Sequence, residues 1–486
     1  MAKYRPSKRF VWSMVVFTPL TIAFYAGFLP ELENLEKAPA RGEIVFSSKR
    51  PEPGKASSRR DSRPPVAQAA SFSLDWLSQQ YENLMVWQKN PWKRERQTFG
   101  SDYFKLLESK QPATQAKVKE LKRLGDALLQ RVLQRYPELA VASKQVPPER
   151  NGFLRWLEFA ERFNPDPKRV SQGLDVPDDI RKHLSGELPW DAAAVRAWLQ
   201  RERANLDEIR SIGLMTEQSI TGIDIERWGF MSARLAKDAG DMLLLEARLA
   251  AEEGDAARAL EAIRAANGLA AHFGEVETPS LLAVTVQILL QLQNQSYALK
   301  HIMPALPAGQ LDPVAWQQTL NPTVAPPSEF ARIMVGEWHV SGREFLMPML
   351  ANAGDPKYPS DPDALIDVNA GYFSQYVDLY ASNSPADWSK ITPPAAPNGS
   401  NLSRASRDAV EILFVGARAW SRGFERAQSA TGMTQAAFAI MQDQPIPNDP
   451  IYGLAYGWDP ATRTLSPPAG PEFEKLQLKP IVVPKP

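Results

Sequence analysis

The sequence predicts an all-α protein with an N-terminal transmembrane helix, an extramembrane body of irregular helical hairpins that is α-solenoid-like, and a small non-helical C-terminal segment. Apolar residues recur at intervals of three and four over most of the chain, which is the spacing of one face of an amphipathic helix. Long alternating runs of Val, Ile and Thr, which would indicate β-strands, do not occur. Proline and asparagine gather in the short stretches between the helical patterns, where turns are expected.

The first element is an uncharged apolar segment, residues 10–29, which follows a basic tail at residues 1–9. Its length of about 20 residues is what a helix needs to cross a bilayer. The basic residues before it and the first acidic residues after it are Lys3, Arg5, Lys8 and Arg9, and Glu31, Glu33 and Glu36. Because basic flanks stay in the cytoplasm, we expect a single pass through the inner (cytoplasmic) membrane, with the N-terminus cytoplasmic and the bulk of the chain periplasmic.

A cleaved signal peptide is the alternative interpretation of this segment. Signal peptides have an apolar core of about 7–15 residues with a small-x-small cleavage site close behind it. Here the apolar core is longer, and the nearby candidate site that ends at Ala26 has Phe24 where a small residue is needed. We therefore expect an uncleaved anchor, with the lipid bilayer as the partner of residues 10–29.

The composition excludes several classes of function. The chain has 486 residues with 56 basic and 56 acidic side chains, so its formal net charge of zero gives no indication of a nucleic-acid partner. It has no cysteine, which excludes disulfides, thiol nucleophiles and zinc–thiolate sites. His-Glu metalloprotease spacing, Gly-x-Ser-x-Gly and a phosphate-binding glycine loop are all missing from the sequence. The sequence therefore predicts no catalytic residue, no metal site and no cofactor.

Residues 30–70 are predicted to be a Pro-rich flexible linker, because they contain few large apolar residues and cannot bury enough surface to fold. The helical body is expected over residues 71–443. Apolar periodicity predicts eight helices or helical pairs around the central hairpin: Leu74–Gln88, Val118–Val132, Phe153–Ala160, Val195–Leu206, Ser280–Leu292, Pro327–Met349, Pro362–Tyr380 and Arg404–Ala427. Tryptophans within these patterns are expected in the core rather than on a sugar-binding surface.

The clearest supersecondary unit is Met242–His272, two helical stretches joined by Glu-Glu-Gly-Asp. Small residues are expected to let the two helices approach closely, while the glycine permits a left-handed turn and the aspartate caps the second helix. The residues in these positions are Leu243, Ala247, Gly254, Asp255, Ala259, Ile263 and Ala266. This unit resembles a tetratricopeptide hairpin, although the pattern does not recur about 34 residues later.

Residues 444–486 form a Pro-rich C-terminal loop and tail with five candidate structural or interaction residues: Asp449, Pro450, Gly453, Tyr456 and Trp458. We expect Asp449 to accept hydrogen bonds from nearby backbone N–H groups and Gly453 to have a positive φ. Ile451, Leu454, Tyr456 and Trp458 are expected to form a small β-hairpin or ordered loop that covers a groove in the helical body. The terminal Leu478–Pro486 is expected to be an exposed, extended segment available to a partner.

The order of anchor, hairpin and Asp449–Tyr456 loop resembles a set of uncharacterised membrane-anchored helical proteins of planctomycete and verrucomicrobial bacteria. Those proteins close with an Asp-Pro-x-x-Gly-x-x-Tyr segment, which is similar to the C-terminal loop of pseudopilins. The long Gly-x-Tyr-Pro stretch that usually precedes that loop is replaced here by Thr431–Met441. The resemblance implies no activity.

The function predicted from the sequence is a non-catalytic, membrane-anchored helical interaction or scaffold protein of the bacterial cell envelope, whose partners are other envelope proteins. One alternative is a component of a secretion or pilus-like machine, suggested by the tail. The other is a glycan-acting envelope hydrolase, because Ser429–Gln435 resembles part of a lytic transglycosylase helix. In that family a glutamate opens the motif in a Glu-Ser pair, whereas Glu425 is followed here by Arg426.

Overall fold

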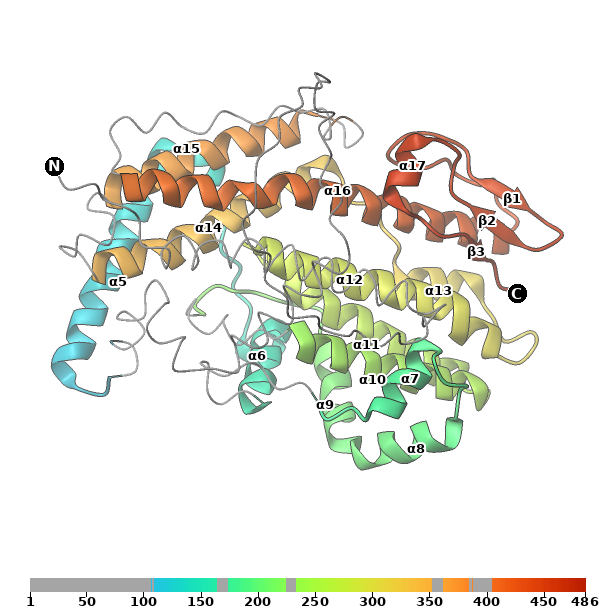
Figure 1. Cartoon of the computed structure of the whole chain (residues 1–486). Coiled ribbons are helices and arrows are strands. Elements are labelled where there is room, and N and C mark those ends of the chain that lie inside the picture. The colour runs from blue at the N-terminus through green and yellow to red at the C-terminus, as the bar shows by residue number, and fades with distance from the viewer. Residues whose placement is uncertain are drawn as a thin grey trace, which may run out of the picture.

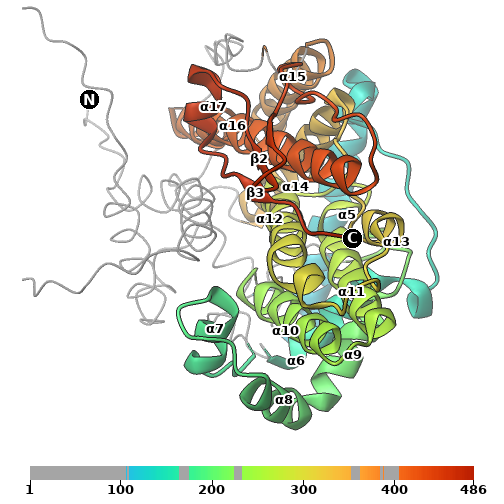
Figure 2. The ribbon, with the colours of Figure 1, turned by 90° about the vertical axis from the view of Figure 1, so that its right-hand side faces the viewer.

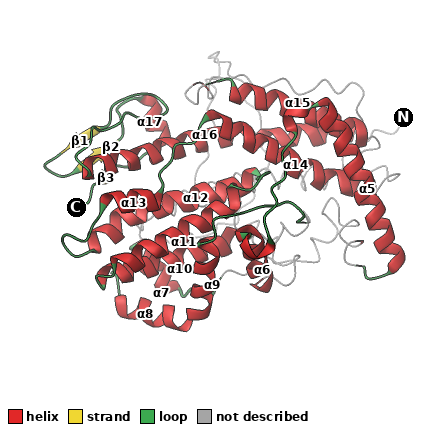
Figure 3. Cartoon of the chain, turned by 180° about the vertical axis from the view of Figure 1, so that it is seen from behind, coloured by secondary structure: helices red, strands yellow, loops and turns green. Residues whose placement is uncertain are grey.

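The computed structural model describes Leu106, residues 109–163, 174–223, 233–351, 362–383, Asp387 and 404–486. The basic tail, the apolar segment 10–29, the linker 30–70 and the helix predicted over Leu74–Gln88 lie outside these residues. Among the described residues, no helix combines the length and the apolar character that a membrane span requires. This part of the chain is mostly helical, with short strands near the C-terminus (Figure 3), which confirms the predicted helical class.

The helices form two tiers (Figure 1), and the upper tier has an aromatic core. Phe330 lies at its centre, with ring centroids 4.0 Å from Tyr380 and 5.7 Å from Phe424. The first helix of this tier packs through Leu128, Leu129 and Val132, one face of its apolar stripe. The tier consists of α5 (Pro112–Arg135), α14 (Pro327–Ala351), α15 (Pro362–Ala381) and α16 (Arg404–Met441).

The lower tier surrounds the predicted hairpin, whose helices α10 (Ala233–Glu252) and α11 (Ala256–Gly274) lie at its centre (Figures 1 and 2). The chain also has four short helical segments among its described residues: η1 (Pro137–Leu139), η2 (Pro148–Arg150), the π-helix η4 (Ala298–Ile302) and η5 (Met303–Ala305). The remaining helices of the tier are α6 (Gly152–Phe163), α7 (Asp178–Ser185), α8 (Ala192–Arg201), α9 (Arg203–Gly213), α12 (Leu281–Tyr297) and α13 (Pro313–Leu320).

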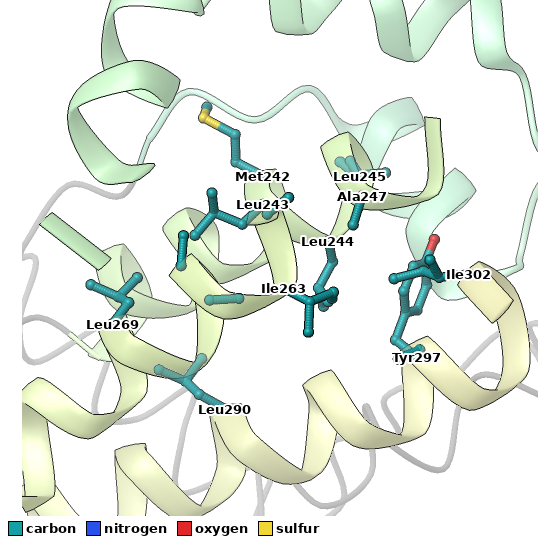
Figure 4. Close-up of a cluster of buried hydrophobic side chains, with 14 of the residues drawn as sticks. Met242, Leu243, Leu244, Leu245, Ala247, Ile263, Leu269, Leu290, Tyr297 and Ile302 are labelled. Carbon is teal, nitrogen blue, oxygen red and sulfur yellow. The ribbon is translucent and has the colours of Figure 1, made fainter. Parts of the chain in front are cut away.

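The hairpin has the local geometry that its sequence predicts. Gly254 has φ of 76°, and the Asp255 side chain accepts a hydrogen bond from the backbone N–H of Arg258 at 3.0 Å. The small and apolar positions of the pattern are fully buried, and Figure 4 shows several of them between α10, α11 and α12. Since α9, α12 and α13 also pack against α11, these side chains form the core of the lower tier rather than a binding surface.

A glycine contact brings α9 and α11 close together. A Cβ added to Gly268 would lie 1.9 Å from the carbonyl oxygen of Gly213, and one added to Gly213 would lie 2.1 Å from that of Ala265. Backbone therefore meets backbone at this crossing, and no side chain larger than hydrogen fits there.

Several helix bounds differ from the prediction: α5 begins at Pro112 rather than Val118, α12 ends at Tyr297 rather than Leu292, and two differences are larger. The pattern over Val195–Leu206 is divided between two helices, because α8 ends at Arg201 and α9 begins at Arg203. The helix predicted to end at Ala427 continues to Met441, since no helix breaker interrupts it and Met433, Ala437 and Phe438 extend its buried face. Two eight-residue helices, α7 and α13, were not predicted because each offers too few turns for a periodic pattern.

The tail is an ordered part of the fold. Its strands β1 (Gly457–Asp459), β2 (Thr464–Ser466) and β3 (Ile481–Val482) form an antiparallel sheet in the order β1-β2-β3, and the short helix α17 (Pro471–Leu476) precedes β3. The chain terminus, predicted to be exposed, instead pairs with β2, and Val483 is 1% exposed. Between the flanking prolines, Val483 still has an N–H, which donates to the carbonyl of Arg463 at 2.9 Å.

The apolar side chains of the loop before β1 were predicted to pack on the helical body, and part of this prediction is confirmed. Ile451 and Tyr456 are buried and Trp458 is half-buried, whereas Leu454 is 47% exposed. The backbone of Leu454 is still fixed, because the Asp449 N–H donates to its carbonyl at 2.8 Å and closes the turn, while its side chain points to solvent.

Candidate binding cleft

A cleft of about 740 Å³ is lined by residues of α12, α14 and α16. Three loops complete its rim: residues 140–144, residues 275–277 and residues 321–326. Its volume is in the range of about 300–1,000 Å³ that is typical of ligand sites. The cleft is therefore the candidate functional site of the described chain.

One wall of the cleft is a face of α12 with a regular pattern. Gln287, Gln291 and Gln295 follow one another at intervals of four, and so occupy one side of the helix. A second row lies beside them, formed by Val284, Ile288 and Leu292. Amide groups and aliphatic groups therefore run in parallel along the cleft.

The polar row ends in a side chain with unused hydrogen-bonding capacity. Gln295 is only 4% exposed, and its side-chain oxygen has no hydrogen-bond partner. A buried polar atom without a partner is costly and calls for an explanation, which a bound donor would supply.

The N-terminus of α12 is fixed by two side chains. Ser280 Oγ accepts from the backbone N–H of Ala283 at 3.0 Å, and Glu337 Oε2 accepts from that of Leu281 at 2.8 Å. Because Glu337 belongs to α14, this bond also joins the two tiers. The helix that carries the row of glutamines is thus fixed in position at its N-terminus.

The opposite wall comes from α14 and α16. It contains the apolar side chains Ile333, Val335, Phe424 and Ala427. Gln428 Oε1 accepts from the backbone N–H of Ala325 at 2.6 Å, and this bond places the rim loop 321–326 against α16.

A carboxylate at the base of the rim organises two loops. Glu277 accepts from the backbone N–H groups of Lys144 and Ile220, each at 2.9 Å, and from the hydroxyls of Ser219 at 2.6 Å and Thr221 at 2.8 Å. Although burial opposes the charge, the hydrogen bonds from Ser219, Ile220 and Lys144 lower the pKa of Glu277 below its ordinary value. Glu277 is therefore a structural carboxylate whose bonding capacity is already used.

Glu275 has a different environment, two residues earlier. Its carboxylate is exposed and accepts from two neutral amides, Gln218 Nε2 at 3.2 Å and Gln287 Nε2 at 3.4 Å. Loss of part of its hydration raises the pKa of Glu275 above its ordinary value, and the charge of Glu329 adds to this, while the charges of Arg332 and Lys144 act in the opposite direction. No ion pair of the described residues includes Glu275.

The cation nearest to Glu275 on the rim is already engaged. Arg332 forms an ion pair with Glu329 and donates to the backbone carbonyls of Gly274 at 2.6 Å and Val276 at 2.7 Å. Arg332 therefore fixes the turn after α11, and Glu275 remains open to a cation from outside.

The residues selected from the sequence do not gather in this cleft. Those of the hairpin lie in the lower core, and those of the tail lie on another side of α16. Asp449 Oδ1 accepts from the backbone N–H groups of Ile451 at 3.0 Å and Tyr452 at 2.8 Å, and Gly453 has φ of 67°, as expected. Pro450 lies against Gly432 of α16, which places the loop on the helix.

The two rows on α12 could have been noticed in the sequence, because glutamines recur every four residues within the predicted helix Ser280–Leu292 and just beyond it. The rim loops gave no such signal. Their positions depend on contacts between residues more than fifty positions apart, such as Glu277 with Ser219 and Lys144.

The other side chains considered for catalysis from the sequence are bonded or buried within the fold. Glu337 caps α12, while His339 Nε2 lies 2.8 Å from the carbonyl oxygen of Leu139, so the two side chains serve different elements. Glu425 is 3% exposed and Ser429 is fully buried. Burial and the charge of Glu425 raise the pKa of Tyr452 to about 12. In the described part of the chain, no group of three or more His, Cys, Asp or Glu side chains could hold a metal ion.

Comparisons with protein-family models, curated proteins and solved structures found no match to this chain. The resemblance to membrane-anchored helical proteins of planctomycete and verrucomicrobial bacteria stays a prediction.

Proposed function

We propose that this chain is a membrane-anchored, non-catalytic scaffold of the bacterial cell envelope, and that its cleft binds an extended segment of another envelope protein. The apolar segment 10–29 would hold the α-solenoid-like helical body at the outer side of the inner membrane. The observation that carries the proposal is the row of amides beside a row of aliphatic side chains on α12.

The spacing of the amides suits an extended polypeptide. Four residues of α-helix advance about 6 Å along the axis. Two residues of extended chain advance about 6.6 Å, and alternate residues face the same side. Gln287, Gln291 and Gln295 would therefore meet backbone groups at alternate residues of a segment that runs along α12.

The chemistry of the two rows also suits such a segment. A carboxamide both donates and accepts, so it can pair with a peptide N–H or C=O whatever the side chain. Val284, Ile288 and Leu292 offer apolar surface to the side chains between these pairs. Such a cleft would recognise the regular spacing of backbone groups in an extended chain. A few charged groups would then select among different sequences.

The glycan-hydrolase alternative receives no support from the geometry. An acid catalyst must reach the glycosidic oxygen. Glu425 is 3% exposed and Ser429 is 0% exposed. The carboxylate nearest to the resembling segment is therefore not accessible to a glycan strand.

Site-specific photo-crosslinking tests the proposal. A benzoylphenylalanine at Gln291 of the full chain, produced in cells of its own host, is expected to form a covalent adduct with a polypeptide that mass spectrometry can identify. The matched control places the same residue at Arg264, an exposed position of α11 outside the cleft. Equal adducts from both positions, or none from Gln291 at equal expression, would contradict the proposal.

A further inference from the structure

We infer that the cleft selects a cationic extended segment, in which a lysine or arginine side chain pairs with Glu275 while backbone groups pair with the amides of α12. This inference rests on the proposed function and deepens it, because it names the chemistry of the partner. It follows from the charges of the cleft, from the position of Glu275 and from the orphaned oxygen of Gln295.

The charged groups that line the cleft are mainly acidic. Four carboxylates, those of Glu138, Glu275, Glu277 and Glu329, face two cationic residues, Lys144 and Arg332. A segment that carries positive charge is therefore favoured over an acidic one.

Most of these groups are engaged within the protein. Glu277 accepts four hydrogen bonds, Arg332 pairs with Glu329 and two carbonyls, and Lys144 Nζ donates to the backbone carbonyl of Glu275 at 3.2 Å. Glu138 accepts from Ser374 Oγ. Glu275 is the carboxylate whose side-chain contacts are to neutral amides alone, so it has the most to gain from a cation.

Glu275 lies at one end of the row of amides. Its Oε1 contacts Nε2 of Gln287, the first amide of the row. Gly274 makes this arrangement possible, since a Cβ there would lie 1.7 Å from Oε1 of Gln287. Glu275 also follows the last residue of α11, where the partial negative charge of the helix terminus favours a cation.

Gln295 lies at the other end of the row. Eight residues of helix separate it from Gln287, a distance of about 12 Å along the axis. An extended chain covers that distance in about four residues. We therefore expect the cationic side chain about four residues from the backbone N–H that donates to Oε1 of Gln295.

Fluorescence anisotropy with the full chain tests the inference. The probe is an eight-residue peptide with blocked ends and a neutral fluorophore, of sequence Gly-Ala-Lys-Ala-Val-Ala-Ala-Gly, and its partner probe has Glu in place of Lys. The lysine peptide is expected to bind, and the glutamate peptide to bind at least tenfold more weakly. Glu275→Gln should weaken the lysine peptide about tenfold, whereas Glu261→Gln, an exposed carboxylate of α11 outside the cleft, should leave its affinity unchanged.

Two further arms identify the contacts. Gln295→Met should weaken both the lysine peptide and a variant with Ala in place of Lys by the same factor, because it removes a backbone contact. Spermidine, a free polyamine, should compete poorly with the lysine peptide because it lacks amide groups. Urea unfolding of each variant verifies that the fold is kept.

The inference is overturned if Glu275→Gln binds the lysine peptide as tightly as the parent, if the glutamate peptide binds equally well, or if neither peptide binds. Full competition by spermidine would also overturn it, because the amides would then have no part in recognition. In each case an adduct at Gln291 in the crosslinking experiment would leave the proposed function standing, and the lack of one would remove both.

Discussion

Replacing Glu277 by Gln should destabilise the fold far more than a change of one atom suggests. Glu277 joins three parts of the lower tier: the turn after α11, the segment 219–221 and the loop that contains Lys144. Its Oε1 accepts from Lys144 N, Ser219 Oγ and Thr221 Oγ1, while Oε2 accepts from Ile220 N. An amide in its place has one oxygen and one NH₂ group.

The loss of stability can be estimated from these four hydrogen bonds. If the amide oxygen keeps the three donors at the Oε1 position, the N–H of Ile220 faces the NH₂ group and loses its acceptor. A buried donor without a partner costs about 1–3 kcal/mol. The other three bonds lose a charged acceptor, a difference of roughly 0.5–1 kcal/mol each. We expect Glu277→Gln to lower the free energy of unfolding by about 2.5–6 kcal/mol in total.

Urea denaturation of the full chain, followed by tryptophan fluorescence, measures this difference. Glu275→Gln is the matched control, the same chemical change two residues away on an exposed side chain. Because its surroundings raise the pKa of Glu275, loss of that charge should cost the fold little. A Glu277→Gln protein that is as stable as the Glu275→Gln protein would refute the reasoning.

The same experiment has a predicted pH dependence. The folded protein lowers the pKa of Glu277 below its ordinary value of 4.5. A carboxyl with a depressed folded pKa contributes stability that is fully present above the unfolded pKa and is lost as the pH falls through the folded pKa. The difference between parent and Glu277→Gln should therefore be largest near neutral pH and shrink below about pH 4.5.

Three other predictions follow from packing and topology. Gly268→Ala should lower the free energy of unfolding by about 1–3 kcal/mol, because its Cβ would overlap the backbone of α9, whereas Gly457→Ala, with 3.5 Å of space, should change little in the same urea experiment. Val483→Asp should lower the thermal midpoint strongly, while Val482→Asp, 66% exposed, should not; equal midpoints would contradict the docked tail. A reporter active only outside the cytoplasm, fused after residue 70, should be active, and activity of a cytoplasmic-only reporter there would contradict the predicted topology.

The helices could be predicted from the sequence where their periodic pattern was long. α14 and α15 were expected nearly at their observed bounds because each offers several turns of one buried face and begins at a proline, whereas α5 begins six residues before the predicted Val118. The turn at Gly254 and the cap at Asp255 were predictable for the same reason: both depend on neighbours within four residues.

The cleft could not be predicted in this way. Its rim depends on hydrogen bonds that Glu277, Arg332 and Gln428 form with residues between 56 and 133 positions away in the chain, and only the pair of Arg332 with Glu329 is local. The terminal strand was missed for a similar reason, since prolines flank a two-residue strand and only the partner strand β2 gives it a place. The periodicity of apolar residues reports only on near neighbours in the sequence, so it does not predict contacts of this kind.

We propose that a polypeptide lies in the cleft beside α12. Hydrogen–deuterium exchange of the full chain, with and without the lysine peptide, tests it most directly because it locates the contact without any substitution. Slower exchange is predicted in the rim loops, residues 140–144, 275–277 and 321–326, with no change in α8. Unchanged exchange in these loops at saturating peptide, or slowing confined to other parts of the chain, would contradict the claim.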